Sequence, residues 1–140
     1  MLGIGPVVCF SYLAAAELWT VPRFPLANCG AEVVSIEQSI AADAPMTAAV
    51  LGALGVPTLL LGNDIGADQL GAEVLAWLRR HGVDSTVGAK TGTATPRITV
   101  VADRNGTRTW FPYLPGVTDS LAALDLSLLK RASFAYIDCC

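Results

Sequence analysis

The sequence is short of charged residues, and this excludes two classes of protein. Only 15% of its 140 residues are charged, and nine Lys and Arg stand against twelve Asp and Glu, for a net charge of −3. Binding to nucleic acid needs an excess of basic side chains to neutralise phosphates, so we expect no nucleic-acid partner. Intrinsic disorder combines low hydrophobicity with high charge. Here 53% of the residues are hydrophobic, which indicates a folded chain.

Patterns for metal binding and disulfides are also missing. The four cysteines form no Cys-x-x-Cys pair, and the single histidine, His81, cannot complete a zinc site with them. The adjacent residues Cys139 and Cys140 are a poor candidate for a structural disulfide. We therefore expect a reduced, cytoplasmic protein without a metal centre.

No apolar run reaches the roughly 18 residues that a membrane-spanning helix requires, so no membrane partner is expected. The stretch from Leu2 to Ala16 is mostly apolar and ends in three alanines, as signal peptides often do. However, no Lys or Arg precedes it, and two glycines and a proline interrupt it. A buried first strand explains this stretch better, and a secreted or anchored protein is the weaker alternative.

The remaining pattern alternates short apolar runs with helical segments. Helices are expected over 44–54, where Asp43 can cap and Pro45 suits the first turn, and between the turn at 62–66 and Gly82, where Asp68 can cap. The first of these should be buried on nearly all sides, because only Thr47 is polar within it. Strands are expected over 7–10, 18–21, 31–36, 58–61, 98–103, 107–113 and 134–137, the last one buried, with helical turns in 121–132.

This order predicts a single α/β unit over residues 1–140 with a largely parallel sheet covered on both faces. The pair Asn105-Gly106 between two β-rich runs predicts a hairpin. No internal repeat, low-complexity tract or linker divides the chain.

Several segments stand in an informative order. They are AADAPMTA at 41–48, LGNDIGADQLG at 61–71, LRRHGVD at 78–84, the hairpin DRNGTRT at 103–109, and the strand that ends at Asp138. Together they resemble the N-terminal half of a ribokinase-like (PfkB) carbohydrate kinase, over about residues 7–140. The most specific part is Gly66-x-Asp68-x-x-Gly71, followed by the amphipathic helix.

The resemblance implies a three-layer α/β sandwich with a mostly parallel sheet and a small β-lid, formed by strands at about 18–36 and part of 97–113. It also implies transfer of the γ-phosphoryl group of ATP, with Mg²⁺, to a hydroxyl of a sugar or nucleoside, and it leaves a homodimer through the lid open. In this family a Gly-x-Gly-Asp segment supplies the catalytic carboxylate, and the sequence contains none. We therefore expect that this chain alone holds no catalytic residue and binds no cofactor.

Three positions depart from the family pattern. The family's sugar-gripping Asp falls near the alanines at 14–16, its Gly-Gly pair is Ala41-Ala42, and its Asn is Met46. Apolar side chains thus replace the polar side chains and the conformationally free glycines of the family pattern. Either the substrate is less hydroxylated or is held differently, or the chain is a non-catalytic ligand-binding or interaction module with a degenerate kinase half-fold.

Four residues are candidates for substrate binding, and each has a structural alternative. Asp43 could bind a hydroxyl or cap its helix, and Met46 could line the site or belong to the core. Asp138 follows a parallel strand, where α/β proteins bind ligands, or it is a solvated strand end. Phe111 could cover a sugar or pack across the hairpin. His81 is expected at the surface without a catalytic role.

The high apolar content on a short chain leaves little polar surface. We expect the edge of the last strand and the apolar face of the 44–54 helix to lack part of their cover. The chain should then self-associate in isolation.

Overall fold

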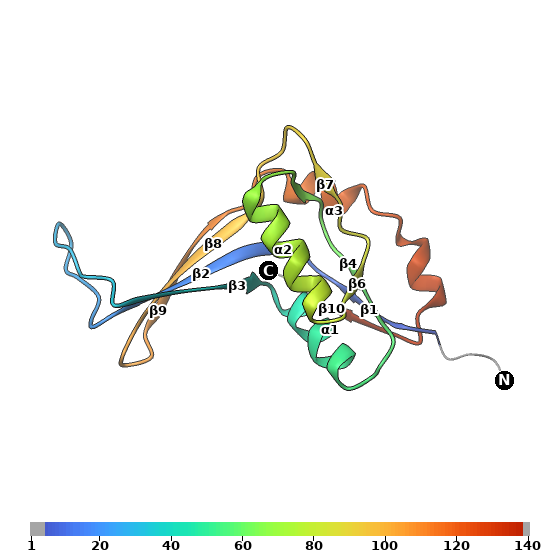
Figure 1. Cartoon of the computed structure of the whole chain (residues 1–140), viewed down its shortest axis with the longest axis horizontal. Helices are drawn as coiled ribbons and strands as arrows, with labels where there is room; N and C mark the ends of the chain where they lie inside the picture. The colour runs from blue at the N-terminus through green and yellow to red at the C-terminus, as the bar shows by residue number, and fades with distance from the viewer. Residues whose placement is uncertain (1–4, 139–140) are drawn as a thin grey trace.

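Two four-stranded sheets organise the chain (Figure 1), whose computed structural model describes residues 5–138; Cys139 and Cys140 lie outside the described residues. The first sheet, called here the body sheet, has the order β10-β1-β4-β6, and all of its strands are parallel. The predicted parallel sheet is confirmed. Its strands are β1 (Val7–Phe10), β4 (Thr58–Leu61), β6 (Asp84–Ser85) and β10 (Phe134–Ile137).

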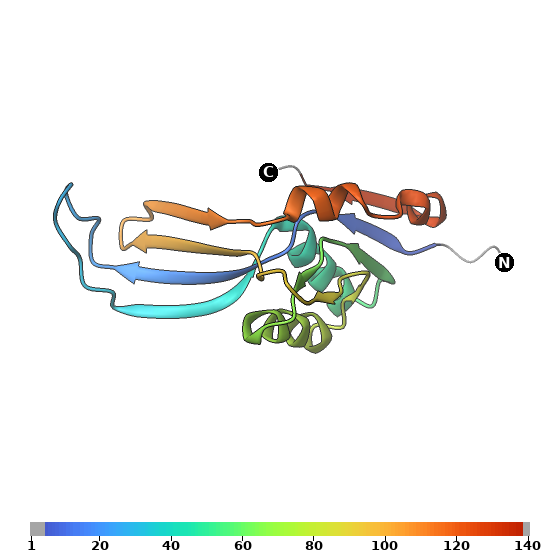
Figure 2. The same ribbon diagram turned by 90° about the horizontal axis from the view of Figure 1, so that it is seen from above.

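Helices cover this sheet on two sides. Helices α1 (Asp43–Ala53) and α2 (Gln69–Arg80) share one apolar core with β1 and β4, in which Cys9 and Leu60 meet Ala48 and Val74. Helix α3 (Val117–Ala122) and the 3-10 helix η1 (Leu126–Arg131) lie on the opposite side of the sheet from α2 (Figure 2). The fold is therefore the expected helix–sheet–helix sandwich. No helix within residues 5–138 has the length and apolar character needed to cross a membrane.

The second sheet extends away from this body in both views (Figures 1 and 2), and we call it the projecting sheet. Its order is β3-β2-β8-β9, with β2 parallel to β8 and the other pairs antiparallel. The hairpin predicted around Asn105-Gly106 is present as β8 and β9. The strands are β2 (Ala14–Val21), β3 (Ser35–Ala41), β8 (Arg97–Asp103) and β9 (Arg108–Tyr113), and a separate short pair joins β5 (Ile65–Gly66) to β7 (Ala89–Lys90).

Two strands of the projecting sheet differ from the prediction. The strand predicted over 31–36 lies at Ser35–Ala41, and the one predicted over 18–21 begins at Ala14. The register explains both differences, because pairing runs from Thr20↔Ser35 to Ala14↔Ala41. The alanines at the base of β2 therefore belong to the ladder, although alanine has little β-propensity by itself.

Helix α1 and strand β10 were both expected to be buried, but each of them exposes apolar side chains. Helix α1 buries Ala44, Pro45, Ala48 and Ala49, but Val50 is 60% exposed. Strand β10 lies at an edge of the body sheet, with Phe134 64% exposed. No strand of residues 5–138 pairs with the outer edge of β10, and the Val50 side of α1 is left largely exposed. The structure thus shows the two uncovered apolar surfaces that the composition suggested.

Candidate functional site

A carboxylate at the edge of the body sheet joins three distant segments. Asp138 directly follows β10, which runs parallel to β1, so it lies beside Ser11. Its Oδ2 atom accepts hydrogen bonds from the Ser11 Oγ at 2.8 Å and from the backbone N–H of Asp43 at 2.9 Å. We call these three residues the Asp138 cluster. It brings together the carboxyl ends of two parallel strands and the first residue of α1, which is where α/β folds bind ligands.

The predicted helix cap at Asp43 is wrong. The N-cap position of α1 is occupied by Ala42, and no side chain within the helix start caps it. The Asp43 side chain is exposed, while its N–H donates to Asp138. A free N–H group at a helix start needs an acceptor, and here the acceptor comes from 95 positions further along the chain. The Asp43 carboxylate is therefore free of the capping role that competed with substrate binding.

Ala42 holds a backbone conformation that side chains rarely adopt. Its φ is 87° and its ψ is 150°, a region populated almost only by glycine. The family resemblance places a glycine here, so the backbone keeps the shape expected of glycine although the residue is alanine. Such a conformation costs on the order of 1–3 kcal/mol and persists only where neighbouring contacts hold it. The bond from Asp43 to Asp138 is one such contact.

A second polar residue fixes the crossover from the body to the projecting sheet. Asn63 is fully buried just after β4, and its side chain accepts from the N–H of Leu13 at 2.7 Å and donates to the carbonyl oxygen of Leu13 at 3.1 Å. Sequence reasoning missed both Asn63 and Ser11. Each is a polar residue that follows a buried strand, the same signal that singled out Asp138.

The other two candidates lie elsewhere. Met46 is 43% exposed on α1, so the core alternative is wrong for it; it follows Asp43 by three residues, on the same side of the helix. Phe111 is 61% exposed on β9, opposite Thr99, which in turn lies opposite Glu17. The structure therefore places Met46 near the Asp138 cluster and Phe111 on the projecting sheet.

The three alanines at 14–16 fill the base of β2. Their exposed fractions are 0%, 5% and 4%, so their methyl groups are packed on both faces of the projecting sheet. A carboxylate at this depth would lose its hydration without a cationic partner, at a large cost in free energy. The alanines that stand where the family pattern has an Asp are therefore the residues that fit this tightly packed position.

The motif Gly66-x-Asp68-x-x-Gly71 has a structural explanation. The Asp68 side chain caps α2 by accepting from the Gly71 N–H at 2.8 Å, which confirms the predicted cap, and it also accepts from the Thr95 hydroxyl at 2.6 Å. Hydrogen bonds from Thr95 and then Gly71 lower the pKa of Asp68. Glycine is needed at 71 because a Cβ there would collide with the carbonyl oxygen of Gly66.

The described residues offer no other reactive centre. His81 is exposed, and its ring stacks on Trp77 with centroids 3.8 Å apart, in agreement with a surface position. Burial raises the pKa of the Cys9 thiol, which disfavours a nucleophilic thiolate. Within residues 5–138, no group of three or more acidic, histidine or cysteine side chains is arranged to hold a metal ion.

Comparison with known proteins identifies the fold. No family model matches the sequence, and no curated protein matches it. Solved structures do match. A ribokinase from Giardia lamblia aligns with a TM-score of 0.78 at 17% identity over 95% of this chain and 42% of that chain. A nucleoside kinase from Methanocaldococcus jannaschii, an archaeal member of the ribokinase family, aligns with a TM-score of 0.75 at 18% identity over 96% and 44%.

A third match carries a nucleotide. The ribokinase from Cryptococcus neoformans var. grubii serotype A, solved in complex with ADP, aligns with a TM-score of 0.68 at 14% identity over 79% of this chain and 34% of that chain. These likenesses show that the chain has the ribokinase-like fold, as its motifs suggested. They also show that it spans less than half the length of the structures it matches.

Proposed function

We propose that this chain is the N-terminal portion of an ATP-dependent kinase of a sugar or nucleoside, and that it supplies the substrate side of the site and the lid. In this proposal residues 1–140 form one unit, and the projecting sheet is the lid. Phosphoryl transfer needs a carboxylate to accept the hydroxyl proton and an anion-stabilising backbone segment. Neither belongs to this portion, so ATP and Mg²⁺ would be used by the complete protein.

The Asp138 cluster is the observation that carries this proposal. A carboxylate, a hydroxyl and a helix N-terminus meet at the carboxyl ends of two parallel strands. Both hydrogen bonds to Asp138 use Oδ2, so Oδ1 is left to accept from a hydroxyl of a substrate. Asp43 and Met46 lie at the same helix start and would complete the substrate contacts. Phe111, exposed on β9, would cover the substrate as part of the lid.

The experiment is a phosphoryl-transfer assay on the protein encoded by the whole reading frame. We expect ATP- and Mg²⁺-dependent phosphorylation of at least one member of a panel of sugars and nucleosides. Asp138→Asn should raise KM for that substrate, while Asp84→Asn, an exposed strand residue outside the cluster, serves as the matched control. A reading frame that lacks any Gly-x-Gly-Asp segment would contradict the proposal.

A second candidate is a non-catalytic ligand-binding module with this fold. The strained alanine at 42 favours it, because its methyl group stands where the family pattern has room for a substrate. Calorimetry on the same panel separates the candidates. Binding without any ATP turnover supports the module, whereas phosphorylation of any panel member excludes it.

Partners and location follow from the same proposal. We propose a small-molecule sugar or nucleoside as the partner, a cytoplasmic location, and a homodimer through the projecting sheet. The exposed apolar side chains on that sheet support the dimer, since Trp110 and Phe111 are each about 60% exposed. Sedimentation velocity on the whole protein tests it, and a monomer at micromolar concentration would contradict it.

A further inference from the structure

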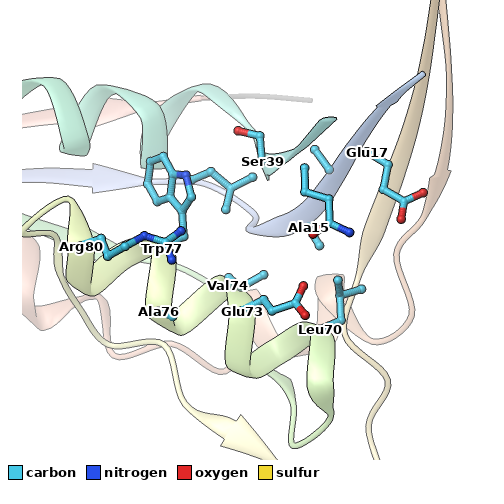
Figure 3. Close-up of a pocket in the computed structure, with 12 residues that line it drawn as sticks. Ala15, Glu17, Ser39, Leu70, Glu73, Val74, Ala76, Trp77 and Arg80 are labelled. Carbon is cyan, nitrogen blue, oxygen red and sulfur yellow. The ribbon is translucent and has the colours of Figure 1, made fainter. Parts of the chain in front are cut away.

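A groove with an apolar floor and charged ends runs between α2 and the projecting sheet (Figure 3). Its cavity volume is about 200 Å³, and a neighbouring hollow of about 290 Å³ shares Glu17, Gln38 and Glu73 with it. The groove contains no residue of the Asp138 cluster. It is therefore a separate feature of the surface, and the proposed kinase function leaves it unexplained.

The floor of the groove is apolar and well buried. Ala15 and Ile40 from the projecting sheet and Val74 from α2 are at least 95% buried, and all three belong to the main core. The half-buried ring of Trp77 forms one wall. Such a surface favours an apolar group of a ligand, and an aromatic wall adds specific contacts.

The two ends of the groove carry opposite charges. Glu17 and Glu73 line one part, and Arg80 lies beside Trp77 at the other end (Figure 3). Glu73 and Arg80 are seven residues apart on α2, which places them on one face of the helix about 10 Å apart along its axis. The charges therefore stand at the two ends of an apolar strip.

The carboxylates at the acidic end are held by neutral donors. Glu17 Oε2 accepts from the indole N–H of Trp19 at 3.1 Å, and Glu73 Oε1 accepts from the Gln69 amide at 2.9 Å. These bonds orient the carboxylates. Arg97 lines the neighbouring hollow together with Glu17 and Glu73, but its guanidinium lies over the Tyr113 ring, 5.6 Å from the ring centroid, so the two carboxylates keep an excess of negative charge. A cationic group between Glu17 and Glu73 would gain charge-assisted hydrogen bonds there.

We propose that this groove binds a small zwitterion in which an ammonium group and a carboxylate stand at opposite ends of an apolar body about 10 Å long. The ammonium would lie between Glu17 and Glu73, the apolar body against Val74 and Trp77, and the carboxylate at the Arg80 guanidinium. Short peptides and ω-amino acids have this chemistry. Gln38 and Ser39 on β3 line the groove and could hydrogen-bond the amides of a peptide.

The test uses 8-aminooctanoate as the probe, titrated into the protein encoded by the whole reading frame and followed by calorimetry and by NMR of the indole N–H groups of Trp77 and Trp110. We expect saturable binding that shifts the indole signal of Trp77 and leaves that of Trp110 unchanged. Octylamine and octanoate each lack one charged end, so each should bind about tenfold more weakly. The absence of saturable binding up to about 10 mM probe would overturn the proposal.

Two variants locate the binding. Glu73→Gln should weaken the binding of the probe and of octylamine by about tenfold and leave the binding of octanoate unchanged. Arg80→Gln should weaken the binding of the probe and of octanoate by about tenfold and leave the binding of octylamine unchanged. Arg79→Gln is the matched control, because Arg79 is exposed on α2 and lies outside the groove. Equal binding of the probe by all three variants would contradict the assignment. The Trp77 shift in the unmodified chain stays decisive if a variant fails to fold.

Discussion

Helices α1 and α2 share one core but are built in opposite ways. Helix α2 carries its own cap at Asp68, and its polar residues face solvent. Helix α1 has a strained alanine at its N-cap, depends on Asp138 for an acceptor, and exposes Val50 and Leu54. The start of α2 is thus specified by residues close in sequence, whereas the start of α1 is specified by a residue distant in sequence. The comparison teaches that the local rules for a helix start are broken at α1, where we propose the substrate side of the site, and kept at α2.

The largest effect should come from the close approach at the start of α2. Gly71→Ala forces a Cβ against the carbonyl oxygen of Gly66, so we expect a loss of about 3 kcal/mol in the free energy of unfolding, measured by urea denaturation. Gly30→Ala is the control, because an added Cβ there meets nothing within 4 Å. A Gly71→Ala variant as stable as the control would show that α2 is loosely packed.

Removal of the local cap should come next. Asp68→Ala deletes acceptors for Gly71 and Thr95 and should lower the free energy of unfolding by about 2 kcal/mol. Because the folded-state pKa of Asp68 is lowered, its contribution is present above the ordinary value of 3.8 and is lost as the pH falls further. The difference between Asp68→Asn and the unmodified chain should therefore shrink below that pH. A constant difference down to the folded pKa would contradict the account.

The distant acceptor of α1 should contribute less. Asp138 is half-buried and accepts from two donors, so Asp138→Ala should cost about 1 kcal/mol. Hydrogen exchange should accelerate at the amide of Asp43 and leave α2 protected. Asp84→Ala, on an exposed strand position, is the control. Uniform acceleration across both helices would show that Asp138 stabilises the whole fold and not α1 in particular.

Ala42→Gly should act in the opposite direction. Glycine removes strain of about 1–3 kcal/mol and costs about 0.5–1 kcal/mol in entropy, so we expect a net gain of about 1 kcal/mol in thermal or urea unfolding. Ala48→Gly, in the regular middle of the same helix, should instead lower stability. A loss at position 42 would mean that its methyl group makes contacts worth more than the strain.

The exposed face of α1 should affect association more than stability. Val50→Lys is expected to change the free energy of unfolding by less than about 0.5 kcal/mol and to reduce self-association in sedimentation velocity. Ala72→Lys on the exposed side of α2 is the control. If the Val50→Lys variant associates as strongly as the unmodified chain, the association surface lies elsewhere, for example at the edge of β10.

Much of this architecture was predictable from local patterns. Asn105-Gly106 located the hairpin, Asp68 located the start of α2, and the apolar runs located β1, β4 and β10, because each signal acts within a few residues. The two-residue strand β6, which has no apolar residue, was missed. The bounds of β3 were missed because they depend on pairing with β2. The residue pattern of α1 predicted burial on nearly all sides, because a mostly apolar helix looks buried whatever surrounds it. Only the high apolar content of the whole chain indicated that one face of α1 lacks part of its cover.

The site was predictable only in part, for the same physical reason. Asp138 stood out as a carboxylate after a parallel strand, but its bonds to Ser11 and Asp43 span 127 and 95 positions. The conformation of Ala42 leaves no trace in composition or periodicity. Asn63 carried the same strand-end signal as Asp138, and it was found only through its bonds to Leu13.

The most direct measurement is an NMR titration of the isotope-labelled chain with ribose, fructose and adenosine. The account predicts that at least one of them shifts the amide signals of Ser11, Asp43 and Asp138 and that the Asp138→Asn variant loses these shifts. Shifts confined to other parts of the chain, or none for any of the three compounds, would contradict the assignment of the Asp138 cluster as the substrate side of a kinase.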